Sequence, residues 1–235
     1  MTYWSDLRDI AMSDDGSLMA VVEYSGTLYT WSTGSWNSAY NGYDDDLTFQ
    51  DWQAIAMSAD GGTIVAVATA NSNGEGGVYL STDFGSTWST VVFGGSASLN
   101  LVDVAVAGSG SRLSAVANGG QVWISADAGA TWATEPPAGI TPAPTVPMAP
   151  APTPAPSASP RAWSAIASSA DGARLAATVS SGSIYTSADS GASWTEDATA
   201  GARNWASIAM SANGQRLAAV EGSIDLSYCL SLIHI

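Results

Sequence analysis

The sequence is poor in charge and in the residue types that most catalytic and redox sites use. Only 11% of its 235 residues are charged, Lys is absent, and Cys and His each occur once. One Cys and one His are too few for a disulfide framework, a Cys/His zinc site or a Cys–His dyad. The net charge of −15 argues against nucleic acid and anionic membranes as partners, because phosphate binding needs clustered cations. No apolar run approaches the roughly 18 residues of a membrane span, and we expect neither a metal nor a cofactor.

Small residues and aromatics replace the missing charge. The chain has 24 Gly and 10 Trp, which suit tight turns and pleated sheets better than long solvent-facing helices. Five segments of the chain have similar sequences, and they begin at Trp4, Trp52, Leu101, Trp163 and Trp205. Apart from one Pro-rich insertion their period is roughly 45 residues, and a four-stranded unit of about that length is typical of a β-propeller blade.

Four short strands fit within each period. In the fourth repeat they are predicted at 163–168, 174–179, 183–187 and 193–195, separated by the Asp-Gly and Ser-Gly pairs that favour hairpins. The sequence therefore predicts an all-β β-propeller of four-stranded blades, with about four complete blades and a partial fifth. We expect one propeller fragment over residues 1–229, with blades at about 4–51, 52–100, 101–135, 163–204 and 205–229, and an inserted loop at 136–160.

One eight-residue pattern recurs where the third strand of a blade turns into the fourth. It reads STDFGSTW, SADAGATW and SADSGASW in blades 2, 3 and 4, and it resembles the Asp-box, Ser-x-Asp-x-Gly-x-Thr/Ser-Trp, of the BNR/Asp-box propellers. That superfamily includes sialidases, sortilin-like receptors and photosystem II assembly factors. The residues that carry the resemblance are Ser81, Asp83, Gly85, Trp88, Ser125, Asp127, Gly129, Trp132, Ser187, Asp189, Gly191 and Trp194. The resemblance implies the fold and leaves the activity open, because one fold hosts many functions.

The chemistry of this pattern favours a structural role. Its Asp can accept hydrogen bonds from backbone N–H groups of the turn, its Gly supplies a positive φ, and its Trp brings a large apolar ring to the neighbouring blade. Metal or ligand binding by the three Asp is the alternative interpretation, and turn capping is the favoured one. The corresponding turn of blade 1 reads Ser-Thr-Gly-Ser-Trp, ending at Trp36, and lacks the Asp of the pattern. The hairpin of blade 1 is therefore expected to be the loosest of the four.

Candidate binding residues fall at the opposite edge of the blades. Within this chain the repeats agree at the turns joining strands one to two and three to four. They differ at the turns joining strands two to three and at the blade-to-blade connections, and variable loops on a rigid scaffold usually carry binding groups. The candidate residues there are Asp44, Asp45, Asp46, Asp51, Glu75, Arg161 and Arg203. Three consecutive Asp side chains point in different directions, so a solvated acidic loop is favoured over a cation site at 44–46.

The insertion holds all ten prolines of the chain, between Pro136 and Pro160. Pro lacks an N–H donor, so we expect an exposed loop, either polyproline-II-like or disordered. Three roles stay open for it. A passive spacer is favoured over a ligand for an aromatic-lined groove and over a carrier of O-glycans.

These features favour a non-catalytic binding or scaffold module whose inter-blade loops recognise a protein or a glycan. The alternatives are a sialidase-like glycoside hydrolase whose catalytic residues lie in blades outside this sequence, and a photosystem assembly-factor-like protein. A sialidase centre is not visible: Arg112, Arg174 and Arg216 occupy the same slot in three repeats, so they point to different places, and spacing nominates no pair of acids. No secretory signal is visible, and only the family resemblance favours an extracellular or cell-surface location.

The last six residues, LSLIHI, resemble the translation of a transposase mosaic end used in sequencing kits. We therefore expect 230–235 to be a non-native tail and the fifth blade to stop after two strands and part of a third. An array of this kind exposes sheet edges and apolar faces, so residues 1–229 are expected to oligomerise or aggregate.

Overall fold

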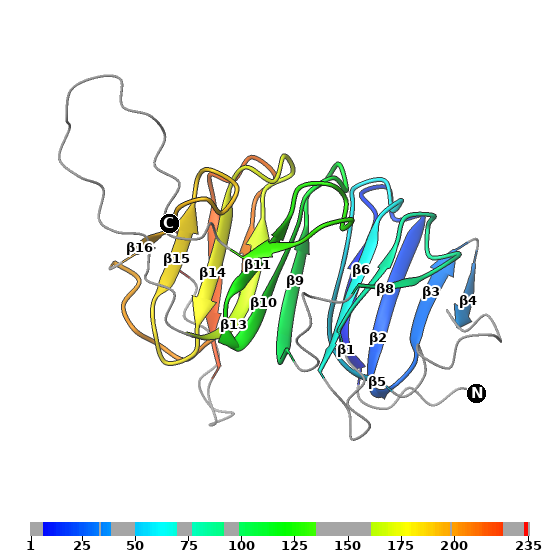
Figure 1. Ribbon diagram of the computed structural model, residues 1–235, viewed down its shortest axis with the longest axis horizontal. Helices are drawn as coiled ribbons and strands as arrows, with labels where there is room; N and C mark the ends of the chain where they lie inside the picture. Colours follow the sequence, from blue (N-terminus) through cyan, green and yellow to red (C-terminus); the bar gives the residue numbers. More distant parts are fainter. Residues whose placement is uncertain are drawn as a thin grey trace.

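The computed structural model describes residues 7–32, 34–38, 50–69, 77–91, 99–134, 161–197, 199–222 and 233–234. Every regular element in these ranges is a β-strand, which confirms the all-β prediction. No helix in the described ranges is long and apolar enough to cross a membrane. The strands follow one another as small antiparallel units, from the blue end of Figure 1 through green to yellow and orange at the other end.

Each unit is a blade of four strands. Blade 1 consists of β1 (Leu7–Met12), β2 (Leu18–Gly26), β3 (Leu28–Ser32) and β4 (Ser35–Ser38). Blade 2 consists of β5 (Gln50–Met57), β6 (Ile64–Thr69), β7 (Gly77–Ser81) and β8 (Ser89–Val91). Blade 3 consists of β9 (Leu101–Val106), β10 (Leu113–Gly120), β11 (Val122–Ser125) and β12 (Ala133–Thr134). Blade 4 consists of β13 (Arg161–Ser168), β14 (Leu175–Val179), β15 (Ile184–Ser187) and β16 (Thr195–Asp197).

The described part of blade 5 has three strands. They are β17 (Trp205–Met210), β18 (Leu217–Glu221) and the two-residue β19 (Ile233–His234). β19 pairs with β18 and lies within the segment expected to be a non-native tail. The prediction of four four-stranded blades and a partial fifth is confirmed in the part of the chain that the structure describes.

The first strands of blades 2 and 4 begin two residues before the Trp that marks each repeat. Their first residues pair with the second strand of the preceding blade, through Gly26↔Gln50 and Gly120↔Arg161. This pairing joins blades 1 and 2 into one eight-stranded sheet and blades 3 and 4 into another, while β17–β19 form a third. An isolated bridge between Gly182 and Arg203 occupies the same place between blades 4 and 5.

The hydrophobic core lies between blades. Four clusters of buried side chains follow one another along the array. Each cluster lies between two consecutive blades and combines one face of a blade with the facing side of the next. In β6, for example, Ala66 and Ala68 face blade 1 whereas Val65 and Val67 face blade 3, and all four are fully buried. Both faces of a middle blade are therefore apolar, which explains why its strands show continuous rather than alternating hydrophobicity.

One edge of the array carries the turns that join strands one to two (residues 13–17, 58–63, 107–112, 169–174 and 211–216) and strands three to four. We call it the turn edge, and the opposite edge the connection edge. One backbone hydrogen bond links each turn to the next blade along this edge: Asp14 N–H to Ala59 O (2.8 Å), Ala59 N–H to Gly108 O (2.9 Å), Gly108 N–H to Ala170 O (2.8 Å) and Ala170 N–H to Ala212 O (2.8 Å). In each of the three middle blades a single residue thus both donates and accepts, and the four bonds link the five blades in series.

Candidate functional site

The Ser-x-Asp-x-Gly turns of blades 2, 3 and 4 form closed hydrogen-bond networks. In blade 4 the Ser187 hydroxyl accepts from Gly191 N–H (2.8 Å) and donates to Asp189 Oδ1 (2.8 Å). Asp189 also accepts from the backbone N–H of Ser193 (2.8 Å) and from its hydroxyl (2.5 Å). The same bonds recur around Asp83 and Asp127 at distances of 2.6 to 2.9 Å. The oxygens of each Asp are therefore engaged within its own turn.

These bonds stabilise the ionised carboxylates. The hydroxyls of Thr87 and Thr131 contribute most to holding the pKa of Asp83 and Asp127 below the usual value. At Asp189 partial burial raises the pKa, but the bonds from Ser193 and Ser187 outweigh it and the pKa is lowered. A carboxylate held in this way caps its turn.

The Gly and Trp of the same turns pack on the preceding blade. Trp88, Trp132 and Trp194 join the core clusters between blades 1 and 2, 2 and 3, and 3 and 4. Each indole N–H donates to the carbonyl of the Gly three residues earlier, at 3.1 to 3.2 Å. These turns are consequently part of the blade–blade contact.

Three of the candidate binding residues lie on the connection edge, and each has a partner within the chain. Asp51 accepts from the Ser25 hydroxyl (2.7 Å). Arg161 lies over the Tyr185 ring, 4.4 Å from its centroid, and donates to the Tyr185 hydroxyl (2.6 Å). Arg203 lies 5.8 Å from the Trp205 ring centroid and pairs with Glu221 at 3.4 Å. The structure places the three in different blades and does not bring them together.

The remaining candidates, Asp44, Asp45, Asp46 and Glu75, lie outside the described residues, as does the Pro-rich insertion at 136–160. Within the described ranges, no group of three or more His, Cys, Asp or Glu side chains is arranged to hold a metal ion.

Sequence reasoning missed two acidic residues on the first strands, Asp9 and Asp103. Each carboxylate bridges to the next blade: Asp9 accepts from Ile55 N–H (2.8 Å) and Asp103 from Ile166 N–H (2.7 Å). Each also accepts from the N–H of the residue that follows it, at 2.9 and 2.8 Å. A comparison of the repeats could have identified them, because Asp9 and Asp103 carry a charge at the position that the small apolar Ala54 occupies in blade 2.

Burial raises the pKa of these two carboxyls. Desolvation raises the pKa of Asp9, although its two backbone N–H bonds lower it. Desolvation raises the pKa of Asp103 to about 7 against the same kind of bonds, and the nearby charge of Asp9 adds to the rise. A carboxyl with this pKa can exchange a proton near neutrality, but both of its oxygens are occupied by backbone donors.

No protein-family model and no curated protein matches the chain. Solved structures do resemble it: the GH74 enzyme of Niastella koreensis (TM-score 0.69, 16% identity, 97% of this chain and 35% of that one) and the GH74 xyloglucanase of Xanthomonas campestris (TM-score 0.66, 20% identity, 97% and 36%). YCF48 of Cyanidioschyzon merolae matches with a TM-score of 0.58 and 15% identity, over 100% of this chain and 72% of its own. The chain spans about a third of the length of the GH74 enzymes. At these identities the likeness shows the fold, which is that of a β-propeller.

Proposed function

We propose that the chain is a non-catalytic binding or scaffold module of the BNR/Asp-box type, which presents its connection edge to a protein or glycan ligand. The Asp-box part of the proposal rests on the three matching turn networks around Asp83, Asp127 and Asp189. Capped turns and backbone bonds between blades engage the polar groups of the turn edge in blades 2 to 4, so we place the protein or glycan ligand on the connection edge.

The observation that carries the proposal is the pairing of Arg with an aromatic ring on the connection edge of three blades. Arg8 lies 4.3 Å from the ring centroid of Tyr24, and Arg161 and Arg203 lie against Tyr185 and Trp205 from other positions of their repeats. Tyr24 is 37% exposed. Tyr185 and Trp205 are buried, at 4% and 1% exposed, so Tyr24 is the ring of the three that a ligand can reach. An exposed ring beside a guanidinium suits sugar faces and peptide side chains, because the ring offers apolar area while its polar neighbour fixes orientation.

Catalysis is the second candidate, and a specific observation favours it. Asp103 has a raised pKa, as a general acid requires, and structures that the chain resembles include a xyloglucanase. Against it, the carboxylates of Asp9 and Asp103 are each held by two backbone N–H groups. We therefore assign them to stabilising the contact between blades.

The test is binding without turnover. We expect the purified chain to retain at least one glycan class on a glycan array that includes xyloglucan oligosaccharides, and to release no reducing sugar from it. Tyr24→Ala should weaken that binding about tenfold. Phe84→Ala is the matched control, since Phe84 is an exposed aromatic (58%) on the turn edge.

Two outcomes would count against the proposal. Release of reducing ends that stops in Asp103→Asn would favour the enzyme. Equal losses in Tyr24→Ala and Phe84→Ala would show that the connection edge is not the binding surface.

A further inference from the structure

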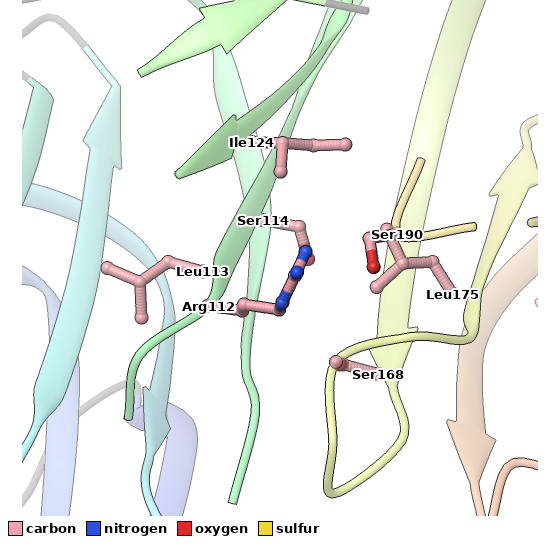
Figure 2. Close-up of a pocket in the computed structure, with 8 residues that line it drawn as sticks. Arg112, Leu113, Ser114, Ile124, Ser168, Leu175 and Ser190 are labelled. Carbon is pink, nitrogen blue, oxygen red and sulfur yellow. The ribbon is translucent and has the colours of Figure 1, made fainter. Parts of the chain in front are cut away.

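The contact between blades 3 and 4 contains a narrow groove at the turn edge, and the Ser-x-Asp-x-Gly turn of blade 4 fills it. Arg112 and Ile124 line it from blade 3, while Gly172 and Ser190 line it from blade 4. In Figure 2 Ser190 and Leu175 of blade 4 face Arg112 and Ile124 across the groove. The free volume that remains is about 10 Å³.

The same groove recurs one blade further on, between blades 4 and 5. Its walls use the equivalent positions: Arg174 for Arg112, Thr186 for Ile124 and Gly214 for Gly172. Here the free volume is about 450 Å³. No residue equivalent to Ser190 lines the groove among the described residues of blade 5, 199–222 and 233–234. We call it groove 4/5.

The occupant of the equivalent groove is the same in every other blade contact. A Cβ built on Gly85 would lie 2.9 Å from Thr30, one on Gly129 would lie 2.7 Å from Leu80, and one on Gly191 would lie 1.9 Å from Ile124. The Gly of each Ser-x-Asp-x-Gly turn thus lies directly on the third strand of the preceding blade, with no room for a side chain. Thr186 is the next position in this series, and it lines groove 4/5.

A backbone hydrogen bond fixes how the turn enters. The residue before the Gly, which itself has a positive φ, donates its N–H to the first turn of its own blade: Phe84 to Gly62 O (3.3 Å), Ala128 to Ser111 O (2.9 Å) and Ser190 to Ala173 O (2.8 Å). In blade 5 the equivalent acceptor position is Gln215, which lines groove 4/5 and is exposed.

We propose that groove 4/5 is a docking site for a Ser-x-Asp-x-Gly β-hairpin supplied by another polypeptide. The Gly of that hairpin lies on Thr186, its preceding N–H donates to the Gln215 carbonyl, and its third-strand segment pairs with β18. The groove continues a contact that the chain already makes three times. Among the described residues that line the groove, Arg174 is the only charged one.

The hairpin competes with β19 for the edge of β18. β19 makes two residue pairs with β18, whereas β15 makes four with β14 in the complete blade. An incoming strand of full length therefore replaces a shorter pairing with a longer one. The apolar surface of groove 4/5 is covered at the same time.

The test uses the full chain and a peptide of residues 183–197, cyclised so that it is held as a hairpin. Its binding is followed by fluorescence anisotropy. A peptide with Gly191→Val is the matched control, because Val at that φ of +89° cannot lie flat on the third strand. We expect the control peptide to bind at least tenfold more weakly. Thr186→Trp in the protein, which fills groove 4/5, should have a similar effect, whereas the exposed turn-edge variant Phe84→Ala should bind as the unaltered chain does.

Three results would overturn the proposal: no saturable binding, equal binding of the two peptides, or unchanged binding by a folded Thr186→Trp protein. If a xyloglucan oligosaccharide competed with the peptide for groove 4/5, the occupant would be a glycan and not a hairpin. Groove 4/5 lies at the turn edge, away from Tyr24, so these results are independent of the glycan-binding test of the connection edge.

Discussion

The contact between blades 3 and 4 and the contact between blades 4 and 5 use the same positions, yet only the first is closed. First and second strands pack in both: Trp163 and Leu175 are buried in one, and Trp205 and Leu217 are buried in the other. The free volume at the turn edge differs nonetheless, at about 10 and about 450 Å³. The comparison shows that the first and second strands are enough to stack two blades. The turn between the third and fourth strands of the following blade then closes the space between them.

Blade 1 shows the same point from the other end. Its first strand carries Leu7, Ile10 and Met12, which are 52%, 60% and 58% exposed. The equivalent Trp52 and Ile55 of blade 2 are 0% and 3% exposed, because blade 1 covers them. Apolar surface is therefore built into every blade, and a neighbouring blade decides whether it is buried.

The largest expected contrast concerns the Trp that ends the third-to-fourth turn. Trp194 is 4% exposed and packs against Trp163 with ring centroids 6.3 Å apart, whereas Trp36 of blade 1 is 40% exposed. Trp194→Ala should cost about 3–5 kcal/mol of unfolding free energy and Trp36→Ala about 1 kcal/mol or less. Urea unfolding of both variants measures the difference. Equal costs would mean that the turn Trp does not contribute to the blade contact.

A smaller contrast separates two Gly residues that have the same φ. Gly191 and Gly34 both have a φ of +89°, but a Cβ on Gly191 would lie 1.9 Å from Ile124 Cδ1, whereas one on Gly34 would touch no described residue within 4 Å. Gly34→Ala carries only the conformational cost of about 1 kcal/mol. Gly191→Ala adds overpacking and should cost about 2–4 kcal/mol. Similar losses in the two variants would show that Gly191 is needed for its φ alone.

The next prediction compares a first-strand carboxyl with a turn carboxyl through pH. The pKa of Asp103 is about 7 in the folded chain and about 3.9 in the unfolded chain, so the folded state holds a proton that the unfolded state has lost. Its stabilising effect is complete below about pH 4 and is lost as the pH rises through about 7. The chain should therefore lose about 1–3 kcal/mol of stability between pH 5 and 8, and Asp103→Asn should lose less.

Asp189 supplies the control for this experiment. The pKa of Asp189 is lowered, so its contribution to stability is present at every pH above the pKa of the unfolded chain. That contribution is lost only as the pH falls below this value toward the pKa of the folded chain. Asp189→Asn should lower stability without changing its slope between pH 5 and 8. Thermal melts across that range measure both variants, and a parallel slope for Asp103→Asn would contradict the role of burial at Asp103.

The repeat pattern was enough to predict the blades. In blade 4 it placed three strands within two residues of β13, β14 and β15 and the fourth two residues before β16, because Asp-Gly and Ser-Gly pairs mark turns by local chemistry. The early start of β13 could not be predicted, since Arg161 pairs with Gly120 of another blade.

The site was harder to predict for the same reason. The bond from Asp103 to Ile166 N–H joins residues far apart in the sequence, and its cause is the packing of two blades. Whether a groove is filled or open likewise depends on the following blade. Thr186 has the same local sequence context as Ile124, so only the assembled array distinguishes them.

The most direct test of the account replaces these two residues with the same large side chain. Ile124→Trp forces a ring into the space that Gly191 occupies, whereas Thr186→Trp places it in groove 4/5. We expect Ile124→Trp to lower the melting temperature by several degrees, for a cost of about 1–3 kcal/mol, and Thr186→Trp to leave it unchanged or raise it. Equal destabilisation of the two variants would contradict the claim that the third-to-fourth turn of the following blade closes each contact.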